Sequence, residues 1–461
     1  MRKIKIILIK ILIIKIGIIN LLAQESKPNI IVYFADDLGY LDVSVYGAEV
    51  VQTPVLQKLN TEGITFNNAF VASPSCAPSR AALLTGLMPA QNGAETNHSY
   101  PNENIPYLIK NLQDVGYKVF AFGKVAHYGG NKKCGFDFHH DEQVNLYPNI
   151  KKFFDTTEIT TPICVFVGDR RPHVAWTEEM MYDPSVVDLP INFIDTTPTR
   201  EHRSRYYTDI TGLDYEMGHV LHYLNNKLGD NIFTLFSSDH GAQWPFGKWN
   251  LYDTGIRTPL IVTWPGNIKP ATMTDDMVSW IDILPTLLDI ANAKIPENLD
   301  GKSFKSILLR NKDEGFRDEI YTTHTGDGKF NIYPIRSIRT NRYKLIYNVI
   351  PEAYHSNHSD ILRKPGAGAY WDSWDEEAKK DPRAASIINK YYLRPAWEFY
   401  DLSVDVGEQN NLINDSAYSN VINTLKEKLE IWMEEQEDDA QAHREPYTTS
   451  GPRPNRSFIE K

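Results

Sequence analysis

Cys76 lies at the start of a segment whose residue types could perform nucleophilic chemistry. It precedes the step Pro78-Ser79-Arg80 and an apolar run that ends at Gly86. Proline favours the first turn of a helix and glycine favours the position after the last turn, so the segment predicts a short helix that begins near Cys76. Because a helix N-terminus carries unpaired N–H groups and a partial positive charge, a group placed there meets anions. A buried structural cysteine at a helix entry is the alternative interpretation.

Two pairs of side chains that could bind a metal ion follow apolar runs elsewhere in the chain. Asp36 and Asp37 come just after the run at 29–34, and Asp239 and His240 come just after the run at 231–237. Oxygen ligands suit hard cations, and this much negative charge in one cleft would be costly without a cation or basic partners. The two pairs therefore predict a hard-cation site, with helix capping by the aspartates as the alternative.

Three further segments carry basic and imidazole side chains suited to an anion. Lys124 and His127 share one short loop, where the lysine would act as a fixed charge and the histidine as a proton carrier. His173 follows Pro172 after another apolar run, and Lys248 lies in the polar segment 247–259. Taken alone the first two motifs are weak, since chance surface positions explain either of them.

The elements that must position these residues form an alternating pattern. Short apolar runs at 29–34, 118–122, 163–167 and 231–237 alternate with helix-like segments, which predicts an α/β fold with a largely parallel sheet. A long amphipathic helix is predicted over 206–228. Charged or imidazole residues follow each run, and ligands of open α/β sheets bind outside the carboxyl ends of the strands. The pattern therefore places the candidate residues at one edge of the sheet.

The character of the sequence changes after about residue 318. Strands are predicted at 342–349 and 397–402 and a closing amphipathic helix at 421–433. Between them the polar stretch 352–382 predicts a long loop, and the acidic, then proline-rich residues after Glu434 predict a poorly ordered tail. We therefore predict a catalytic domain at 24–318 and a smaller C-terminal α+β domain at 319–461.

The N-terminus and the composition indicate the setting of the protein. Residues 1–23 combine a basic start with an Ile/Leu-rich stretch, which is typical of a secretory signal peptide, and Lys10 and Lys15 disfavour a permanent membrane anchor. We therefore predict export to a periplasm or outside the cell. The net charge of −11 argues against a nucleic-acid partner. Cys134 and Cys164 could form one disulfide, but the apolar run around Cys164 favours a buried free thiol.

Two of these segments also resemble the signatures of a known family. The segment 73–86, with its Leu83-Leu84-Thr85-Gly86 end, resembles the first signature of the type I sulfatases, and 247–259 resembles the second. The segments 91–93, 333–339 and 391–401 are similar to the heparan N-sulfatase (sulfamidase) branch. The resemblance implies an alkaline phosphatase-like fold, in which helices flank a mixed, mostly parallel central sheet and the C-terminal domain carries an antiparallel sheet.

The same resemblance implies roles for the candidate residues. A maturing enzyme would convert Cys76 to formylglycine (3-oxoalanine), whose hydrated form attacks sulfur after deprotonation by Asp36 or Asp239. The leaving group would take a proton from His173 or Lys248, and His127 would then promote the release of sulfate. The implied ligands of a Ca²⁺ ion are Asp36, Asp37, Cys76, Asp239 and His240, where His240 replaces the commoner asparagine. The implied sulfate-site residues are Cys76, Arg80, Lys124, His127, His173 and Lys248, and we predict substrate contacts from His98, His324 and Arg336.

The function that follows is hydrolysis of sulfate esters, or of an N-sulfate, on a sulfated carbohydrate such as the algal polysaccharide ulvan. The alternative within the family is an N-sulfoglucosamine sulfohydrolase acting on heparan-type glycans. A phosphatase or phosphodiesterase of the alkaline phosphatase superfamily is less favoured, because it needs a threonine or serine nucleophile and a fuller set of zinc ligands. A non-catalytic glycan-binding relative would be expected to lose the Cys76–Arg80 core or the metal pairs, and this chain has both. The sugar, the position of the sulfate and the oligomeric state stay open.

Overall fold

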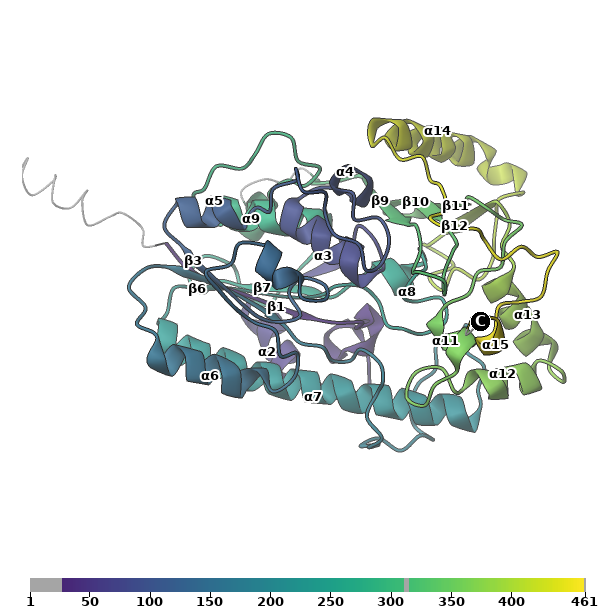
Figure 1. The fold of residues 1–461 in the computed structure, drawn as a ribbon, viewed down its shortest axis with the longest axis horizontal. Coiled ribbons are helices and arrows are strands. Elements are labelled where there is room, and N and C mark those ends of the chain that lie inside the picture. Colours follow the sequence, from purple (N-terminus) through teal and green to yellow (C-terminus); the bar gives the residue numbers. More distant parts are fainter. Residues whose placement is uncertain (1–26, 311–314, 460–461) are drawn as a thin grey trace, which may run out of the picture.

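The computed structural model describes residues 27–310 and 315–459, which form two β-sheets with helices around them (Figure 1). The larger sheet has the strand order β4-β3-β5-β1-β6-β7-β2-β8. Its neighbouring strands run parallel except at β7, which is antiparallel to both β6 and β2. The strands are β1 Asn29–Ala35, β2 Ile64–Phe70, β3 Lys118–Gly123, β4 Phe138–His140, β5 Ile163–Gly168, β6 Ile232–Ser238, β7 Leu260–Thr263 and β8 Thr272–Ser279.

The central strands are buried because helices cover both faces of this sheet. β1 pairs with β5 on one side and β6 on the other, so that Ile31 lies opposite both Val165 and Thr234. In Figure 1, α2, α6 and α7 lie below the sheet and α3, α5 and α9 lie above it. Strands covered on both faces consist of continuous apolar runs, which is why the sequence revealed them. These helices are α2 Pro54–Glu62, α3 Cys76–Thr85, α5 Ile109–Asp114, α6 Leu146–Thr156, α7 Thr197–Leu228 and α9 Ile283–Ile290.

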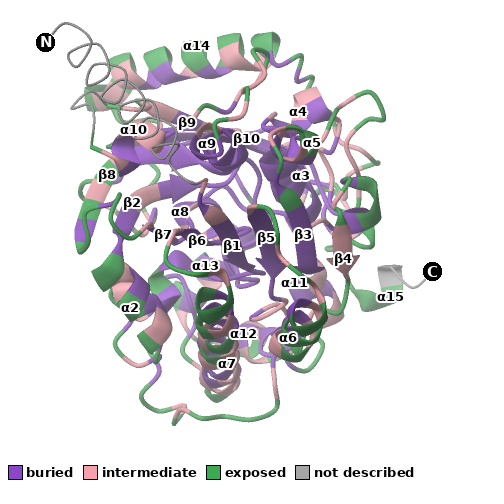
Figure 2. Ribbon diagram, turned by 90° about the vertical axis from the view of Figure 1, so that its left-hand side faces the viewer, coloured by how far each residue is buried: buried purple, intermediate pink, exposed green. Residues whose placement is uncertain are grey.

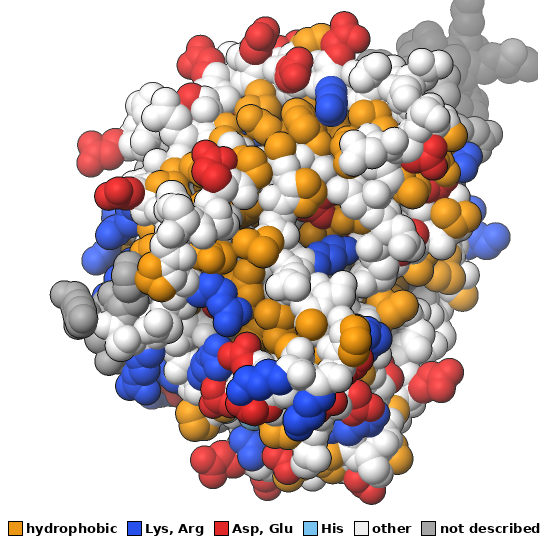
Figure 3. Space-filling model, turned by 90° about the vertical axis from the view of Figure 1, so that its right-hand side faces the viewer, with side chains coloured by type: hydrophobic (Ala, Val, Ile, Leu, Met, Phe, Trp, Pro, Cys, Tyr) orange, Lys and Arg blue, Asp and Glu red, His pale blue; other side chains and the backbone are white. Residues whose placement is uncertain are grey.

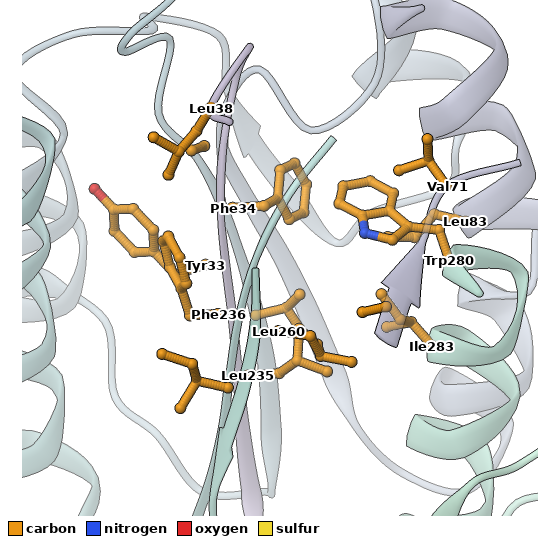
Figure 4. Packing of buried hydrophobic residues seen from close by; sticks show 14 of the residues in the cluster. Tyr33, Phe34, Leu38, Val71, Leu83, Leu235, Phe236, Leu260, Trp280 and Ile283 are labelled. Carbon is orange, nitrogen blue, oxygen red and sulfur yellow. The ribbon is translucent and has the colours of Figure 1, made fainter. Parts of the chain in front are cut away.

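The core lies between the sheet and its helices (Figure 2). Successive residues of a strand point to opposite faces, and Figure 4 shows Tyr33 on one side of the strands and Phe34 on the other. The Phe34 ring meets Trp280 edge to face, with 5.7 Å between the ring centroids. Trp280 Nε1 also donates a hydrogen bond to Ser237 Oγ of β6 at 2.9 Å. This packing gives the loops at the ends of β1 and β6 a rigid base.

The smaller sheet is antiparallel, in the order β12-β11-β10-β9. Helix α14 (Ser419–Glu435) covers it, and Leu429 of this helix belongs to the same buried cluster as Ile338 of the sheet. Asp253 of α8 (Asp253–Ile256), next to the larger sheet, pairs with Arg339 and Lys344 of the smaller one. These buried ion pairs join the two sheets. The strands are β9 Glu319–His324, β10 Ile335–Thr340, β11 Tyr343–Asn348 and β12 Trp397–Asp401.

The remaining elements are short helices and 3₁₀ turns in the connections. The helices are α4 Pro89–Asn92, α10 Lys305–Leu308, α11 His358–Leu362, α12 Trp371–Glu377, α13 Pro382–Tyr392 and α15 Arg456–Ile459. The 3₁₀ turns are η1 Tyr40–Asp42, η2 Ser44–Tyr46, η3 Gly130–Lys133, η4 Trp280–Asp282 and η5 Ser416–Tyr418. Over residues 27–310 and 315–459, none of the helices combines the length and apolar character of a membrane span.

The predicted fold class is confirmed, and so are the strands at 29–34, 118–122, 163–167 and 231–237, to within one residue. The helix predicted over 206–228 begins earlier, at Thr197, because the side chain of Thr196 caps it by accepting from the N–H of Thr199. The strands at 342–349 and 397–402 and the helix at 421–433 correspond to β11, β12 and α14. The signal peptide predicted at 1–23 lies outside the described residues, and the boundary at 318 stays a prediction.

The prediction of a long loop over 352–382 is wrong. This stretch contains α11 and α12, and Trp371 and Trp374 of α12 are fully buried. Trp374 Nε1 donates to Thr199 Oγ1 of α7 at 2.7 Å. Burial of the two indole rings, Trp374 against α7 and Trp371 against Tyr391, outweighs the polar composition of this stretch.

The chain after Glu434 was predicted to be poorly ordered, yet its described residues make specific contacts. Asp438 is buried in an ion pair with Arg336 of β10, and Tyr354 N donates to the Tyr447 carbonyl at 2.8 Å. Neither Cys134 nor Cys164 forms a disulfide; both are buried free thiols.

Candidate active site

The loops at the carboxyl ends of four neighbouring strands bring the predicted residues together. Asp36 and Asp37 follow β1, Lys124 follows β3, His173 lies after β5, and the 239–240 pair follows β6. Since β3, β5, β1 and β6 are adjacent, the four loops meet at one edge of the sheet. Cys76 comes from a different element, as the first residue of α3.

Backbone contacts hold the Cys76 loop against this edge. The N–H of Trp249 donates to the carbonyl of Pro74 at 2.8 Å, and Ser79 Oγ donates to the Asp239 carbonyl at 2.6 Å. Asp37 has a positive φ of 66°, and its N–H donates to Asp239 Oδ1 at 3.0 Å. The two segments that resemble sulfatase signatures, 73–86 and 247–259, are therefore in direct contact.

The side chain of Cys76 faces both metal-binding pairs and a lysine. Its Sγ lies 3.3 Å from Lys248 Nζ and from His240 Nε2, 3.7 Å from Asp36 Oδ1 and 3.9 Å from Asp37 Oδ1. Burial opposes ionisation of the thiol, but Lys124, Lys248 and His240 outweigh it and hold the pKa of Cys76 well below its usual range. More polar partners surround this sulfur than one thiol can use.

Three cations balance the three carboxylates beside Cys76. Asp36 bonds Lys124 Nζ at 2.6 Å, and Asp37 bonds Lys248 Nζ at 2.8 Å. Arg80 joins Asp36 to Asp239 through bonds of 3.0 Å and also donates to the Lys124 carbonyl. Burial opposes the charge of Asp36, yet Lys124 outweighs it and holds the pKa of that carboxyl far below its usual range. Arg80 therefore orients the two acids. It is not among the residues that line the cavity beside Cys76.

His240 completes a set of donors that fits a hard cation. Its Nδ1 lies 2.9 Å from the Gly241 carbonyl, which can only accept, so Nδ1 carries a proton and Nε2 points toward the carboxylates. Burial disfavours the imidazolium, but Asp239 outweighs it and raises the pKa of His240 to about 9. For Asp239, burial favours the neutral carboxyl group and raises its pKa to about 7. Ligand atoms of Asp36, Asp37, Cys76, Asp239 and His240 all lie within 4.8 Å of one another.

A cavity of about 500 Å³ opens beside Cys76. The predicted residues that line it are Cys76, His98, Lys124, His127, His173 and Lys248. His173 is partly exposed, with Nε2 at 3.9 Å from Asp37 Oδ2. Figure 3 shows the face at the right-hand side of Figure 1, where Lys and Arg side chains lie among hydrophobic ones. A volume of this size is typical of small-molecule sites.

A chain of hydrogen bonds leads from Asp327 through His98 to His127. Asp327 Oδ1 lies 3.3 Å from His98 Nε2, and His98 Nδ1 lies 2.8 Å from His127 Nε2. Because a carboxylate only accepts, His98 Nε2 carries the proton, and His98 Nδ1 accepts from His127 Nε2. His127 Nδ1, which has no partner among the described residues, is left with a free lone pair. This nitrogen is the one that can accept a proton from a group bound in the cavity.

Several lining residues carry no motif and were not predicted from the sequence. Asp327, in the β9–β10 connection, accepts hydrogen bonds from Asn97 Nδ2 at 2.8 Å and Trp249 Nε1 at 2.9 Å. Asn97 in turn accepts from the N–H of Ala77, next to Cys76. His358 of α11 stacks on Trp249. The one local signal for Asp327 was its place in a polar turn soon after a strand. Arg170, which is partly exposed, and Lys364, which is exposed, also line the cavity and define what we call its outer part.

The structure places His324 and Arg336 away from the cavity, contrary to the prediction that they contact the substrate. His324 is fully buried, and its Nε2 bonds Asn331 Oδ1 at 3.0 Å. Arg336 is fully buried in an ion pair with Asp438 from the C-terminal segment. Both side chains are used in packing the smaller sheet.

Comparisons with known proteins agree with this geometry. The family model described as Sulfatase matches residues 28–293, which is more than half of the chain. The chain belongs to the sulfatase family. It is therefore a sulfuric ester hydrolase. A second model, N-sulphoglucosamine sulphohydrolase, C-terminal, matches residues 240–358, so this sulfatase belongs to the sulfamidase-like branch that the sequence resembled.

Relatives of this sulfatase extend over nearly the whole chain. An ulvan-active sulfatase of Formosa agariphila is 30% identical over 450 residues, which is 95% of this chain and 86% of that protein. The N-sulphoglucosamine sulphohydrolase of Homo sapiens is 26% identical and covers 90% of this chain and 92% of its own length. A solved structure of a 2-O GAG sulfatase has the same fold, with a TM-score of 0.69, 21% identity and coverage of 94% and 100%.

Proposed function

We propose that this sulfatase removes sulfate from a sulfated carbohydrate, with residue 76 as the nucleophile, in the breakdown of a polysaccharide such as ulvan. The observation that carries the proposal is the position of Cys76 Sγ, 3.3 Å from both Lys248 Nζ and His240 Nε2 and beside both acidic pairs. The relative that is an ulvan-active sulfatase supports this substrate class. Export through a signal peptide at 1–23 is part of the proposal.

The residues around Cys76 fit a formylglycine and a calcium ion. A formylglycine at position 76, made by a maturing enzyme, would supply a hydrated aldehyde whose oxygen attacks sulfur. Asp36, Asp37, Asp239 and His240, together with residue 76, would hold Ca²⁺, because three carboxylates and the Nε2 of His240, which would give up its proton to bind an ion, converge there. The excess of hydrogen-bond partners around Sγ supports the modification, since two hydroxyl groups would use partners that one thiol leaves idle.

The chain's own residues supply the rest of the chemistry. Lys124 and Lys248 place two fixed positive charges beside the sulfate, where they counter the charge that develops in the transition state. His173, which is partly exposed, or Lys248 donates a proton to the leaving oxygen or nitrogen. His127 Nδ1 accepts a proton from the group at position 76, and His98 and Asp327 hold its ring in the required tautomer.

An N-sulfate is the second candidate for the scissile group. The match of residues 240–358 to the N-sulphoglucosamine sulphohydrolase C-terminal model favours it, as does the human relative of that activity. The substrate would then be an N-sulfated glucosamine of a heparan-type glycan. The same nucleophile and cation would serve, because only the leaving atom changes from oxygen to nitrogen.

Release of free sulfate from O-sulfated and N-sulfated oligosaccharides tests the proposal. We expect release by the wild type and loss of release in Cys76→Ala, whereas Cys134→Ala, the matched variant of another buried free thiol, stays active. Equal release by wild type and Cys76→Ala would refute the assigned nucleophile. Mass measurement of the tryptic peptide around residue 76 reports separately on the loss of sulfur and the gain of oxygen.

A further inference from the structure

The cations that line the cavity fall into two groups. Lys124 and Lys248, beside Cys76, are paired with Asp36 and Asp37. Arg170 and Lys364 line the same cavity but have no carboxylate within ion-pair distance in the described parts of the chain. Their positive charge is therefore not balanced by a protein carboxylate in contact.

Each unpaired cation has a sequence neighbour that is fully paired. Arg171, next to Arg170, bonds Asp169 and approaches Glu216 at 3.6 Å. Arg363, next to Lys364, pairs with both Asp372 and Asp375 at 2.7 Å. Carboxylates therefore lie within reach of both loops, yet the two cations that line the cavity are not paired with them.

Two loops that contact each other hold these cations at the cavity. Arg170 follows β5, and Lys364 follows α11. The N–H of Trp176 in the first loop donates to the carbonyl of Gly366 in the second at 2.7 Å. Gly366 has φ +65°, and a Cβ there would lie 2.8 Å from the Trp176 carbonyl oxygen, so this close approach requires glycine.

The two cations are held differently within these loops. Arg170 Nη2 donates to the Val174 carbonyl at 2.7 Å, which fixes its guanidinium group near the cavity. The carbonyl of Lys364 accepts from the N–H groups of residues 367, 368 and 369, so its backbone is fixed while its side chain is exposed. Both charges are therefore available to a ligand at known positions in the fold.

Among the described residues that line the cavity, Asp327 is the one with a carboxylate group. Its oxygens already accept hydrogen bonds from Asn97, Trp249 and His98. The outer part of the cavity is thus positive in a protein of net charge −11. We propose that Arg170 and Lys364 bind a second anionic group of the substrate, a carboxylate or another sulfate, while the scissile sulfate lies beside Cys76. This inference rests on the proposed function and assigns the substrate to saccharides with at least two anionic groups.

Matched pairs of saccharides test this second subsite. One pair is a sulfated, uronate-containing oligosaccharide and its carboxyl-reduced form, and the other is a neutral-backbone saccharide with two sulfates or one. We expect the wild type to prefer the more anionic member of at least one pair in kcat/KM. The double variant Arg170→Gln/Lys364→Gln should reduce that preference by about tenfold, in line with two partly exposed ion pairs. The pair that responds identifies the second group as carboxylate or sulfate.

A control variant keeps the same change in net charge. Lys152→Gln/Lys269→Gln removes two exposed lysines outside the cavity and should retain the wild-type preference. The inference is overturned if the wild type prefers neither anionic member, or if the cavity variant keeps the full preference. Calorimetric binding of the same saccharides to Cys76→Ala protein gives this result without turnover. If the Cys76→Ala protein binds the more anionic saccharide more tightly but the wild type releases no sulfate, the proposed reaction is rejected and the second subsite is kept.

Discussion

Replacement of Asp327 by asparagine should reverse the direction of the hydrogen bonds that reach His127. The new amide oxygen can still accept from Asn97 Nδ2 and Trp249 Nε1, so its NH₂ group faces His98 Nε2. His98 must then present a lone pair at Nε2 and a proton at Nδ1. His127 Nε2 becomes the acceptor, and the proton moves to His127 Nδ1, the nitrogen that should have been free. Asp327→Asn is therefore expected to lower kcat.

The size of this effect follows from the geometry. The same change in a Ser-His-Asp triad costs about 10⁴ in kcat through the wrong tautomer. The His98 side chain is 43% exposed, and its bond to Asp327 is long at 3.3 Å, so water can partly replace it. We therefore expect a loss of about 10- to 100-fold in kcat. The two retained bonds become neutral, which should reduce the free energy of unfolding by about 2 kcal/mol.

The assay is sulfate release at saturating substrate, with the unfolding free energy measured in urea. Asp300→Asn is the control, because Asp300 also accepts from a backbone N–H and a side-chain amide but lies away from His98. In a His98→Ala background the tautomer is no longer controlled by Asp327, so Asp327→Asn should add little to the loss of activity. Wild-type kcat in Asp327→Asn, or the same fold-loss in the His98→Ala background, would refute the reasoning.

Three further predictions concern stability. Burial raises the pKa of Asp360 to about 7, so the folded state holds a proton that the unfolded chain releases above about pH 4, and stability falls as pH rises between these values. Asp360→Asn should remove this dependence of the unfolding free energy on pH and be more stable than the wild type at pH 8 by up to about 4 kcal/mol. Urea unfolding at pH 5 and 8 measures this, and an equal pH dependence in wild type and variant would contradict it. Lys344→Met leaves Asp253 and Glu408 without their shared cation and should cost about 3–5 kcal/mol, whereas Lys58→Met at the exposed pair with Glu62 should cost less than about 1 kcal/mol; similar losses would argue against the buried network. A chelator should lower the Tm of the wild type, and added Ca²⁺ should restore it. Asp37→Asn should lose this response, and an unchanged wild-type Tm on chelation would contradict a resident cation.

The sequence by itself determined four adjacent strands of the larger sheet, β3, β5, β1 and β6, and the side chains at their carboxyl ends. Buried parallel strands consist of continuous apolar runs, so the strand that precedes Asp36 and the one that precedes Asp239 could be identified locally. Adjacency of the parallel strands then placed the acids, Lys124 and His173 at one edge. The contact between Cys76 and Lys248 was implied by the resemblance of two segments to a known family.

Only the tertiary structure decided the outer part of the site. Asp327, Arg170 and Lys364 come from irregular connections, which have no periodicity to mark them, and their positions depend on contacts between loops distant in sequence. The same reason removed His324 and Arg336 from the predicted site, because the partner of Arg336 is Asp438, more than 100 positions along the chain. Local patterns thus determine elements and motifs, whereas the partner of a buried charge is decided by the fold.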